Sequence, residues 1–183
     1  MPEYICFLRA INVGGHTVKM EELRAMFISL GFQSVDTFIA SGNVIFQASQ
    51  DPGALEKTIE AHLHLSLGYE VAAFLRTRSE VAAIARYKPF PEPQLKSAAA
   101  LNVVFLSQPL RAESRKALMA LRTAIDEFQV HGREVYWLCR KKQSKSTFSN
   151  VLFERTLKIR STFRGIKTVE KLAAKYPDPE NDG

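Results

Sequence analysis

The order of strand-like and helix-like segments limits the folds open to this chain more than any other feature of its sequence. A short apolar run ended by glycines predicts a buried strand at 4–9. Apolar side chains at helical spacing predict helices over 20–30 and 51–67. A hairpin over 35–48 and a strand over 69–76 complete the order β-α-β-β-α-β. This is the split βαβ order of the ferredoxin-like fold.

The same order of segments comes again after a proline-containing stretch at 88–93. That stretch follows a short helix predicted at 79–86 and is itself expected to be a stiff linker. Beyond it, the same patterns predict a second set of elements. Strands are expected at 100–107, 125–130, 134–140 and 159–163, and helices at 111–122, 146–157 and 166–175.

The chain is therefore predicted to be α+β, with two tandem ferredoxin-like (βαββαβ) subdomains plus a C-terminal helix. The duplication is one of pattern, because the two halves share little sequence identity. We place the first subdomain with its linker helix at 1–87, the linker at 88–97, and the second subdomain with the C-terminal helix at 98–176. Residues 177–183 are acidic and contain proline, which predicts a disordered tail.

The composition is that of an ordinary globular protein, with 46% hydrophobic and 24% charged residues. No apolar run reaches the roughly 20 residues that a membrane span needs, and the N-terminus lacks the basic segment of a secretory signal. We therefore expect a cytoplasmic protein with no membrane partner. Cys6 and Cys139 each lie in an apolar strand-like run, which favours small buried side chains over a disulfide or a nucleophile.

Positive charge is concentrated in the second half of the chain. The net charge of the whole chain is +6. Residues 1–88 carry 8 basic and 9 acidic side chains, whereas residues 89–183 carry 17 and 10. Such a surface attracts phosphate groups, nucleic acid or an acidic protein. The other interpretation is that the charge only keeps the protein in solution.

The first candidate site lies where the first strand runs into a glycine pair. In a split βαβ unit, this loop and the tip of the following hairpin share one edge of the sheet. Paired glycines permit a positive φ and can form an anion nest beside a helix N-terminus. The alternative is that the asparagines only tie the two loops together. The candidate ligand-binding residues are Arg9, Asn12, Gly14, Gly15, Lys19, Ser41 and Asn43.

The second candidate site lies in the basic half of the chain. The loop after the strand at 134–140 and the strand at 159–163 are both expected near the N-terminus of the helix at 146–157. Side chains from these segments could surround one basic pocket, or could form a solvated basic loop. The candidate anion-binding residues are Lys145, Ser146, Asn150, Thr162 and Arg164.

The remaining histidines and aromatic residues are weaker indications of chemistry. His62 and His64 flank one residue on a helix and lack the spacing of metal ligands, so we expect neither a metal nor a cofactor. His16, beside the glycine pair, is a candidate for proton transfer. Tyr136 and Trp137 suggest either the aromatic sheet of an RNA-recognition module or ordinary core packing.

A set of short motifs extends over nearly the whole chain. They are YICFLRAINVGG at 4–15, KMEELR at 19–24, LGF at 30–32, SGNVIF at 41–46, GREVY at 132–136, SN at 149–150, TV at 168–169 and KLA at 171–173. With these motifs the chain resembles the bacterial family called Domain of Unknown Function 1697. The resemblance implies a small cytosolic α+β protein with a duplicated ferredoxin-like arrangement and no established activity. The family tends to carry Arg-Ser-Lys where this chain has 145–147 and Thr-Arg-Asn-Trp-Asn-Thr where it has 163–168.

The sequence favours binding of a phosphate-bearing small molecule or nucleic acid, through the Gly14-Gly15 edge, the basic second half, or both. A structural or protein-partner module without a ligand site is one alternative. An enzyme of unidentified reaction at the edge formed by Asn12, Ser41 and Asn43 is another. No catalytic residue is identified, and the oligomeric state stays open.

Overall fold

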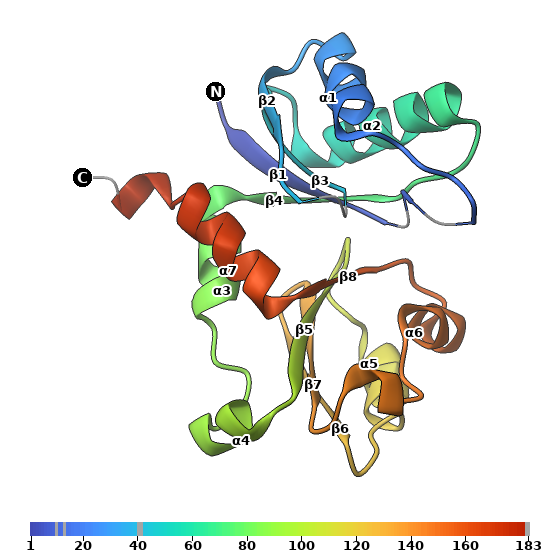
Figure 1. Ribbon diagram of the computed structural model, residues 1–183, viewed down its shortest axis with the longest axis vertical. Helices are drawn as coiled ribbons and strands as arrows, with labels where there is room; N and C mark the ends of the chain where they lie inside the picture. The colour runs from blue at the N-terminus through green and yellow to red at the C-terminus, as the bar shows by residue number, and fades with distance from the viewer. Residues whose placement is uncertain (10, 13, 40–41, 182–183) are drawn as a thin grey trace. The chain divides into compact units, whose positions relative to one another are not determined.

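The computed structural model describes residues 1–9, 11–12, 14–39 and 42–181 (Figure 1). The chain divides into two compact units. The first unit contains residues 1–83 and the chain from Leu172 onward, and the second unit contains residues 84–171. Both contain an antiparallel four-stranded sheet, so the predicted α+β class is confirmed.

The first unit has the strand order β2-β3-β1-β4, with every neighbouring pair antiparallel. Helices α1 and α2 cover one face of this sheet (Figure 1). They bury Leu23, Phe27, Leu55 and Ile59 against the strands. The elements are β1 (Glu3–Leu8), α1 (Met20–Ser29), β2 (Gln33–Thr37), β3 (Asn43–Gln47), α2 (Pro52–Leu67) and β4 (Ala73–Thr77).

Helix α2 shows how local sequence sets the limits of an element. The Asp51 carboxylate accepts hydrogen bonds from the backbone N–H groups of Gly53 (3.0 Å) and Ala54 (3.3 Å), and Pro52 occupies the first turn. At the other end, Gly68 has φ +82°, the left-handed conformation that terminates many helices. The helix therefore begins and ends where the sequence predicts.

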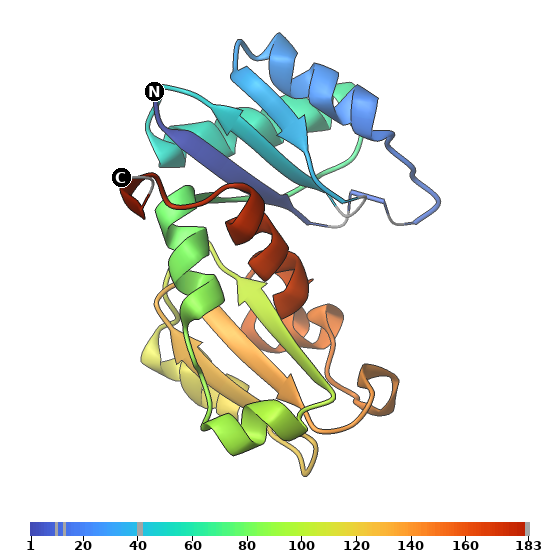
Figure 2. The same ribbon diagram turned by 60° about the vertical axis from the view of Figure 1, so that its left-hand side comes forward.

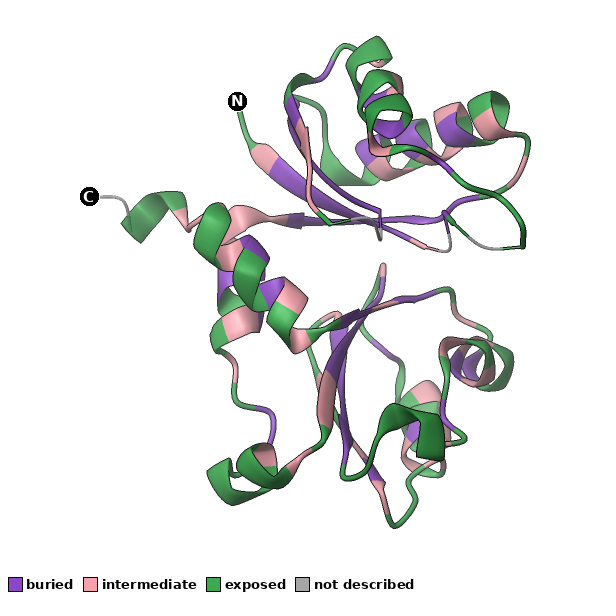
Figure 3. Ribbon diagram, in the orientation of Figure 1, coloured by how far each residue is buried: buried purple, intermediate pink, exposed green. Residues whose placement is uncertain are grey.

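The second unit repeats this strand order as β6-β7-β5-β8, again antiparallel throughout. Helices α5 and α6 cover one face of its sheet (Figure 2). Leu118 and Phe153 pack there against Trp137 and Val104, and β7 is buried along its whole length (Figure 3). The elements are α4 (Glu92–Ser97), β5 (Ala100–Phe105), α5 (Ala112–Met119), β6 (Asp126–His131), β7 (Glu134–Cys139), a 3₁₀ turn (Gln143–Lys145), α6 (Asn150–Leu157) and β8 (Thr162–Gly165).

Helices α3 (Arg78–Arg86) and α7 (Ile166–Lys175) each begin in one unit and end in the other along the chain. Helix α4 occupies the second part of the predicted linker at 88–97. No helix of the described ranges is both long enough and apolar enough to cross a membrane.

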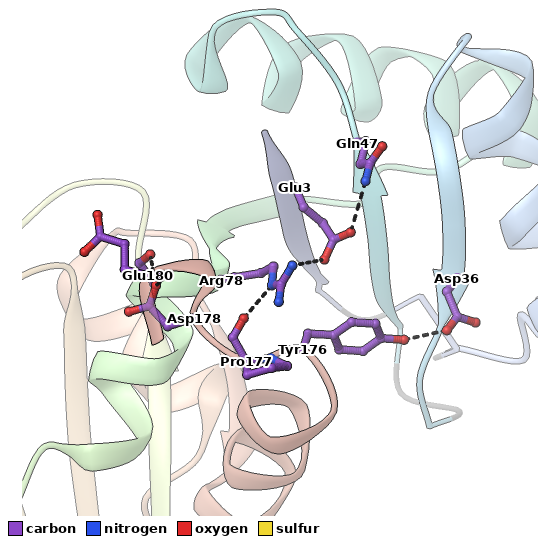
Figure 4. A network of polar contacts seen from close by, with 9 residues as sticks. Glu3, Asp36, Gln47, Arg78, Tyr176, Pro177, Asp178 and Glu180 are labelled. Carbon is purple, nitrogen blue, oxygen red and sulfur yellow. Dashed lines mark hydrogen bonds and ion pairs between the residues drawn. The ribbon is translucent and has the colours of Figure 1, made fainter. Parts of the chain in front are cut away.

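The C-terminal segment differs from the disordered tail that its composition predicts. A 3₁₀ turn spans Pro179–Asn181, and two hydrogen bonds join the segment to the start of α3. Arg78 Nε donates to the Pro177 carbonyl (2.6 Å) (Figure 4). Ser79 Oγ donates to Asp178 Oδ1 (2.8 Å). These donors lie about one hundred residues earlier in the chain, so the local composition could not indicate them.

Candidate functional site

The two loops of the first candidate site contact each other, as the strand order predicts. Leu8 N donates to the Gly42 carbonyl (2.9 Å), which joins the end of β1 to the turn between β2 and β3. Gly42 has φ +81°, and a Cβ added there would lie 2.9 Å from Ile11 Cγ2. Because no side chain fits in that space, glycine is required for the loops to approach.

Both asparagines of this edge hold the backbone of their own loops. Asn12 Oδ1 accepts from Val18 N (2.8 Å), which closes the loop that leads into α1. Asn43 is 1% exposed, and its Nδ2 donates to the Phe38 carbonyl (2.9 Å). Each of these bonds lies within one loop, whereas the alternative interpretation expected side-chain bonds from one loop to the other.

The glycine pair has the backbone conformation that the sequence predicts. Gly14 and Gly15 have φ +64° and +81°, and both are exposed. The His16 ring stacks on Tyr69 with centroids 4.0 Å apart, and the Tyr69 hydroxyl donates to the Ile11 carbonyl (2.8 Å). His16 therefore packs onto the loop itself.

The remaining residues of the first candidate site lie around this loop. Arg9 N donates to the Ala72 carbonyl (2.9 Å), where the chain leads into β4. Lys19 directly precedes α1, and its backbone N–H contacts Glu22 Oε2 at 3.4 Å. Ser41 lies outside the described residues.

In the second candidate site, Ser146 belongs to a buried polar cluster rather than to an open pocket. Its hydroxyl donates to Asp126 Oδ1 (2.8 Å), which also accepts from Trp137 Nε1 (2.8 Å). Thr123 Oγ1 donates to the other carboxylate oxygen (2.7 Å). The fully buried Asp126 carboxylate is thus stabilised by three hydrogen bonds. Lys145 is exposed beside this cluster, at a shallow cavity of about 250 Å³.

Thr162 and Arg164 lie on the opposite face of the same sheet. In β8 they alternate with Phe163, which packs into the core beneath α5 and α6 together with Trp137. Since successive side chains of a strand point to opposite faces, Thr162 and Arg164 point away from Ser146. Arg164 Nη1 donates to Thr162 Oγ1 and to the Phe163 carbonyl, both at 2.8 Å.

The predicted single basic pocket therefore does not form from these five residues. Asn150, at the start of α6, is a third separate position: its Oδ1 accepts from the Ser161 hydroxyl at 2.5 Å. The prediction located the segments near one another but did not include the strand register, which determines the face on which each side chain lies.

One cavity of the second unit lies where β8 ends and α7 begins. It encloses about 590 Å³, and we call it the Asn102 cavity. In the sheet register, Gly165 is the last residue of β8 and lies opposite Asn102, so β8 does not cover the first part of β5. Tyr87, Leu95 and Lys167 are also part of the cavity wall.

Asn102 is the unusual residue of this cavity. The side chain is 7% exposed, yet its amide nitrogen has no hydrogen-bond partner among the described residues. A Cβ added to the neighbouring Gly165 would lie 3.9 Å from Asn102 Oδ1, an ordinary van der Waals distance, and the amide nitrogen itself is closed to solvent. Our sequence interpretation did not include Asn102. Its one signal was an asparagine within an otherwise apolar strand, ALNVVF.

The second unit has another cavity, and every charged residue that lines it is basic. It encloses about 450 Å³ beside the start of α5 and the end of α6. Arg111, Lys158 and Arg160 line it, together with neutral residues. It is therefore a further surface that attracts anions.

Both cysteines are buried, as the sequence predicts. Cys6 and Cys139 are free and buried, and burial raises the pKa of the Cys139 thiol, which disfavours the nucleophilic thiolate. No group of three or more His, Cys, Asp or Glu side chains that could hold a metal ion occurs within the described part of the chain.

Comparison with known proteins identifies a family. The model of the family described as "Protein of unknown function (DUF1697)" matches residues 1–136. The chain belongs to this family. The fold is similar to that of the conserved bacterial protein SP0830 from Streptococcus pneumoniae, with a TM-score of 0.73 and 23% sequence identity. That match covers 94% of this chain and 97% of the other. No curated protein matched the chain.

Proposed function

We propose that the chain binds a phosphate-bearing small molecule through its second unit. The observation that carries this proposal is the division of charge. The second unit has 18 basic and 7 acidic side chains, a net charge of +11, whereas the first unit has 7 and 12, a net charge of −5. An anion is therefore attracted to the second unit and repelled by the first.

The geometry favours a small molecule over nucleic acid. Two cavities of the second unit, of about 590 and 450 Å³, are of the size that small-molecule sites usually have. Proteins that read single-stranded RNA on a sheet stack bases on exposed aromatic rings. Tyr136, Trp137 and Phe105 are each at most 2% exposed, so these rings are not available to bases. Core packing is the interpretation that their burial supports.

The edge around Gly14 and Gly15 is the weaker place for an anion. Its asparagines form hydrogen bonds within the edge, and the surrounding unit has a negative net charge. We therefore give this edge a structural role, in which each asparagine holds the backbone of its own loop.

We also infer that each unit is one copy of a ferredoxin-like subdomain. The shared strand orders β2-β3-β1-β4 and β6-β7-β5-β8 support this inference. A crystal structure that traces the same βαββαβ path twice is the expected result, and a different order in either sheet would contradict it.

Calorimetric titration of the full chain tests the proposed function. AMP and ribose 5-phosphate are the phosphate-bearing ligands, and adenosine and ribose are their phosphate-free controls. We expect only the phosphate-bearing compounds to bind, with affinity that falls between roughly 50 and 200 mM salt. A single-stranded oligonucleotide of mixed sequence is measured in parallel. The proposal fails if neither monophosphate binds at low salt.

A further inference from the structure

We propose that the basic cavity of about 450 Å³ in the second unit is the phosphate-binding site, and that its ligand is a small molecule with two linked phosphate groups. The charged residues of its wall are Arg111, Lys158 and Arg160, and we call it the Lys158 cavity. This inference rests on the proposed function, because it assigns a location and a ligand class to the same binding activity.

The first observation is the charge of the cavity wall. Its three cations come from two separate segments: Arg111 directly precedes α5, whereas Lys158 and Arg160 lie between α6 and β8. Within the described ranges no acidic side chain belongs to the wall, and even Glu113, two residues after Arg111, is not part of it. The wall of the Asn102 cavity, in contrast, includes two carboxylates. Cations around one space repel one another, and an anion that binds among them removes this repulsion.

The second observation is the backbone of Lys158, which ends α6 with φ +57° and ψ 36°. Its N–H donates to the Glu154 carbonyl (2.8 Å). In the first unit, α2 ends with the same kind of bond, from Gly68 N to the His64 carbonyl (2.9 Å), at φ +82°. The left-handed conformation is favourable for glycine and strained for a residue with a Cβ. The second unit therefore has a strained lysine where the first unit has the residue that suits the backbone, which indicates a role of this lysine other than folding.

The neutral residues of the wall can complete the binding of an anion. Ser107 and Ser114 are half-buried, and a hydroxyl can donate a hydrogen bond to a phosphate oxygen. The side-chain amide of Gln108 is a further donor of the wall. Pro109 and Ile159 give the cavity a small apolar surface for the organic part of the ligand. Positive charge, neutral donors and apolar surface thus occur together in one cavity.

The number of cations sets the ligand class. A phosphate monoester carries about two negative charges at neutral pH, and a diphosphate carries one more. Three cations without a carboxylate in the wall therefore match a diphosphate better than a monophosphate. Two linked phosphates are also longer than one, which suits cations that come from two separate segments. The volume of about 450 Å³ is within the range of small-molecule sites.

Calorimetric titration of the full chain with ADP, AMP and inorganic pyrophosphate tests the ligand class. The buffer contains no divalent cation, because such an ion would neutralise part of the phosphate charge. We expect ADP to bind about tenfold more tightly than AMP. Pyrophosphate should compete with ADP, since the cavity recognises the linked phosphates.

Three full-length variants test the location. Lys158→Gly removes the charge and suits the left-handed backbone, so we expect a melting temperature at least as high as that of wild type, with ADP affinity about tenfold lower or weaker still. Arg111→Gln removes a cation from the other segment and should weaken ADP binding to a similar extent. Lys116→Gln is the matched control, because this lysine is exposed on α5 outside the cavity wall. Its affinity for ADP should stay within about twofold of wild type.

The outcomes separate the two proposals. If wild-type protein binds neither AMP nor ribose 5-phosphate at low salt, the proposed function fails and this inference fails with it. If AMP and ADP bind to wild type, and Lys158→Gly and Arg111→Gln bind ADP as tightly, the Lys158 cavity is the wrong site while the proposed function stands. AMP binding at least as tight as ADP binding would overturn the ligand class. A loss of affinity in Lys116→Gln as large as in the cavity variants would reveal a general effect of charge and would overturn the location.

Discussion

The two units share a strand order but use their buried asparagines differently. In the first unit, Asn43 is 1% exposed and donates to the Phe38 carbonyl (2.9 Å). In the second unit, Asn102 is 7% exposed, and its amide nitrogen has no partner in the described part of the chain. The units also differ in net charge, −5 against +11. The same strand order thus accommodates one bonded asparagine and one whose amide nitrogen has no described partner, in units of opposite net charge.

The largest expected effect tests whether the first edge is structural. Gly42→Ala should destabilise the chain by about 3 kcal/mol, since it adds a strained positive φ and a close contact. The new Cβ would be 2.9 Å from Ile11 Cγ2. Gly15→Ala is the control, because Gly15 has the same φ of +81° with no neighbour within 4 Å. We expect it to cost about 1 kcal/mol. Urea unfolding measures both, and equal losses would contradict the close loop approach.

The two asparagines can be compared by one substitution at each. Asn43→Leu should cost about 2 kcal/mol of unfolding free energy, because it leaves the Phe38 carbonyl without its bond. Asn102→Leu should change stability by less than about 0.5 kcal/mol, because it removes a buried group that has no bond to lose. Thermal and urea unfolding of the two variants provide the comparison. A loss at Asn102 as large as that at Asn43 would mean that its amide has a structural partner.

These substitutions also mark what the sequence could and could not predict. Strand and helix order, the glycine turns and the Asp51–Pro52 helix start depend on neighbours in the sequence, and these were predictable. The separation of Ser146 from Arg164 depends on strand register, which the sequence pattern did not define. The Asn102 cavity depends on where β8 ends beside a distant strand, so the sequence could only indicate an unusual asparagine.

The smallest expected effect concerns the C-terminal contact within the first unit. The Tyr176 hydroxyl donates to Asp36, and this bond, more than the backbone and Lys175 contacts, lowers the pKa of the Asp36 carboxyl (Figure 4). A lowered pKa gives stability that is present above the unfolded value of about 4 and is lost as the pH falls through the folded value. Because the Asp36 side chain is 50% exposed, the contribution should stay below about 1 kcal/mol.

Asp36→Asn provides the measurement for this contact. Unfolding of wild type and variant should differ at pH 7, and the difference should shrink as the pH falls below about 4. A difference that stays constant down to pH 2 would show that ionised Asp36 does not contribute.

The most direct test of the account is a ¹H–¹⁵N NMR titration of the full chain with AMP, with ribose 5-phosphate as the smaller ligand. The account predicts shifts of backbone amides within the second unit, residues 84–171, with no shift at Gly14 and Gly15. Shifts at Gly14 and Gly15, with residues 84–171 unchanged, would contradict it.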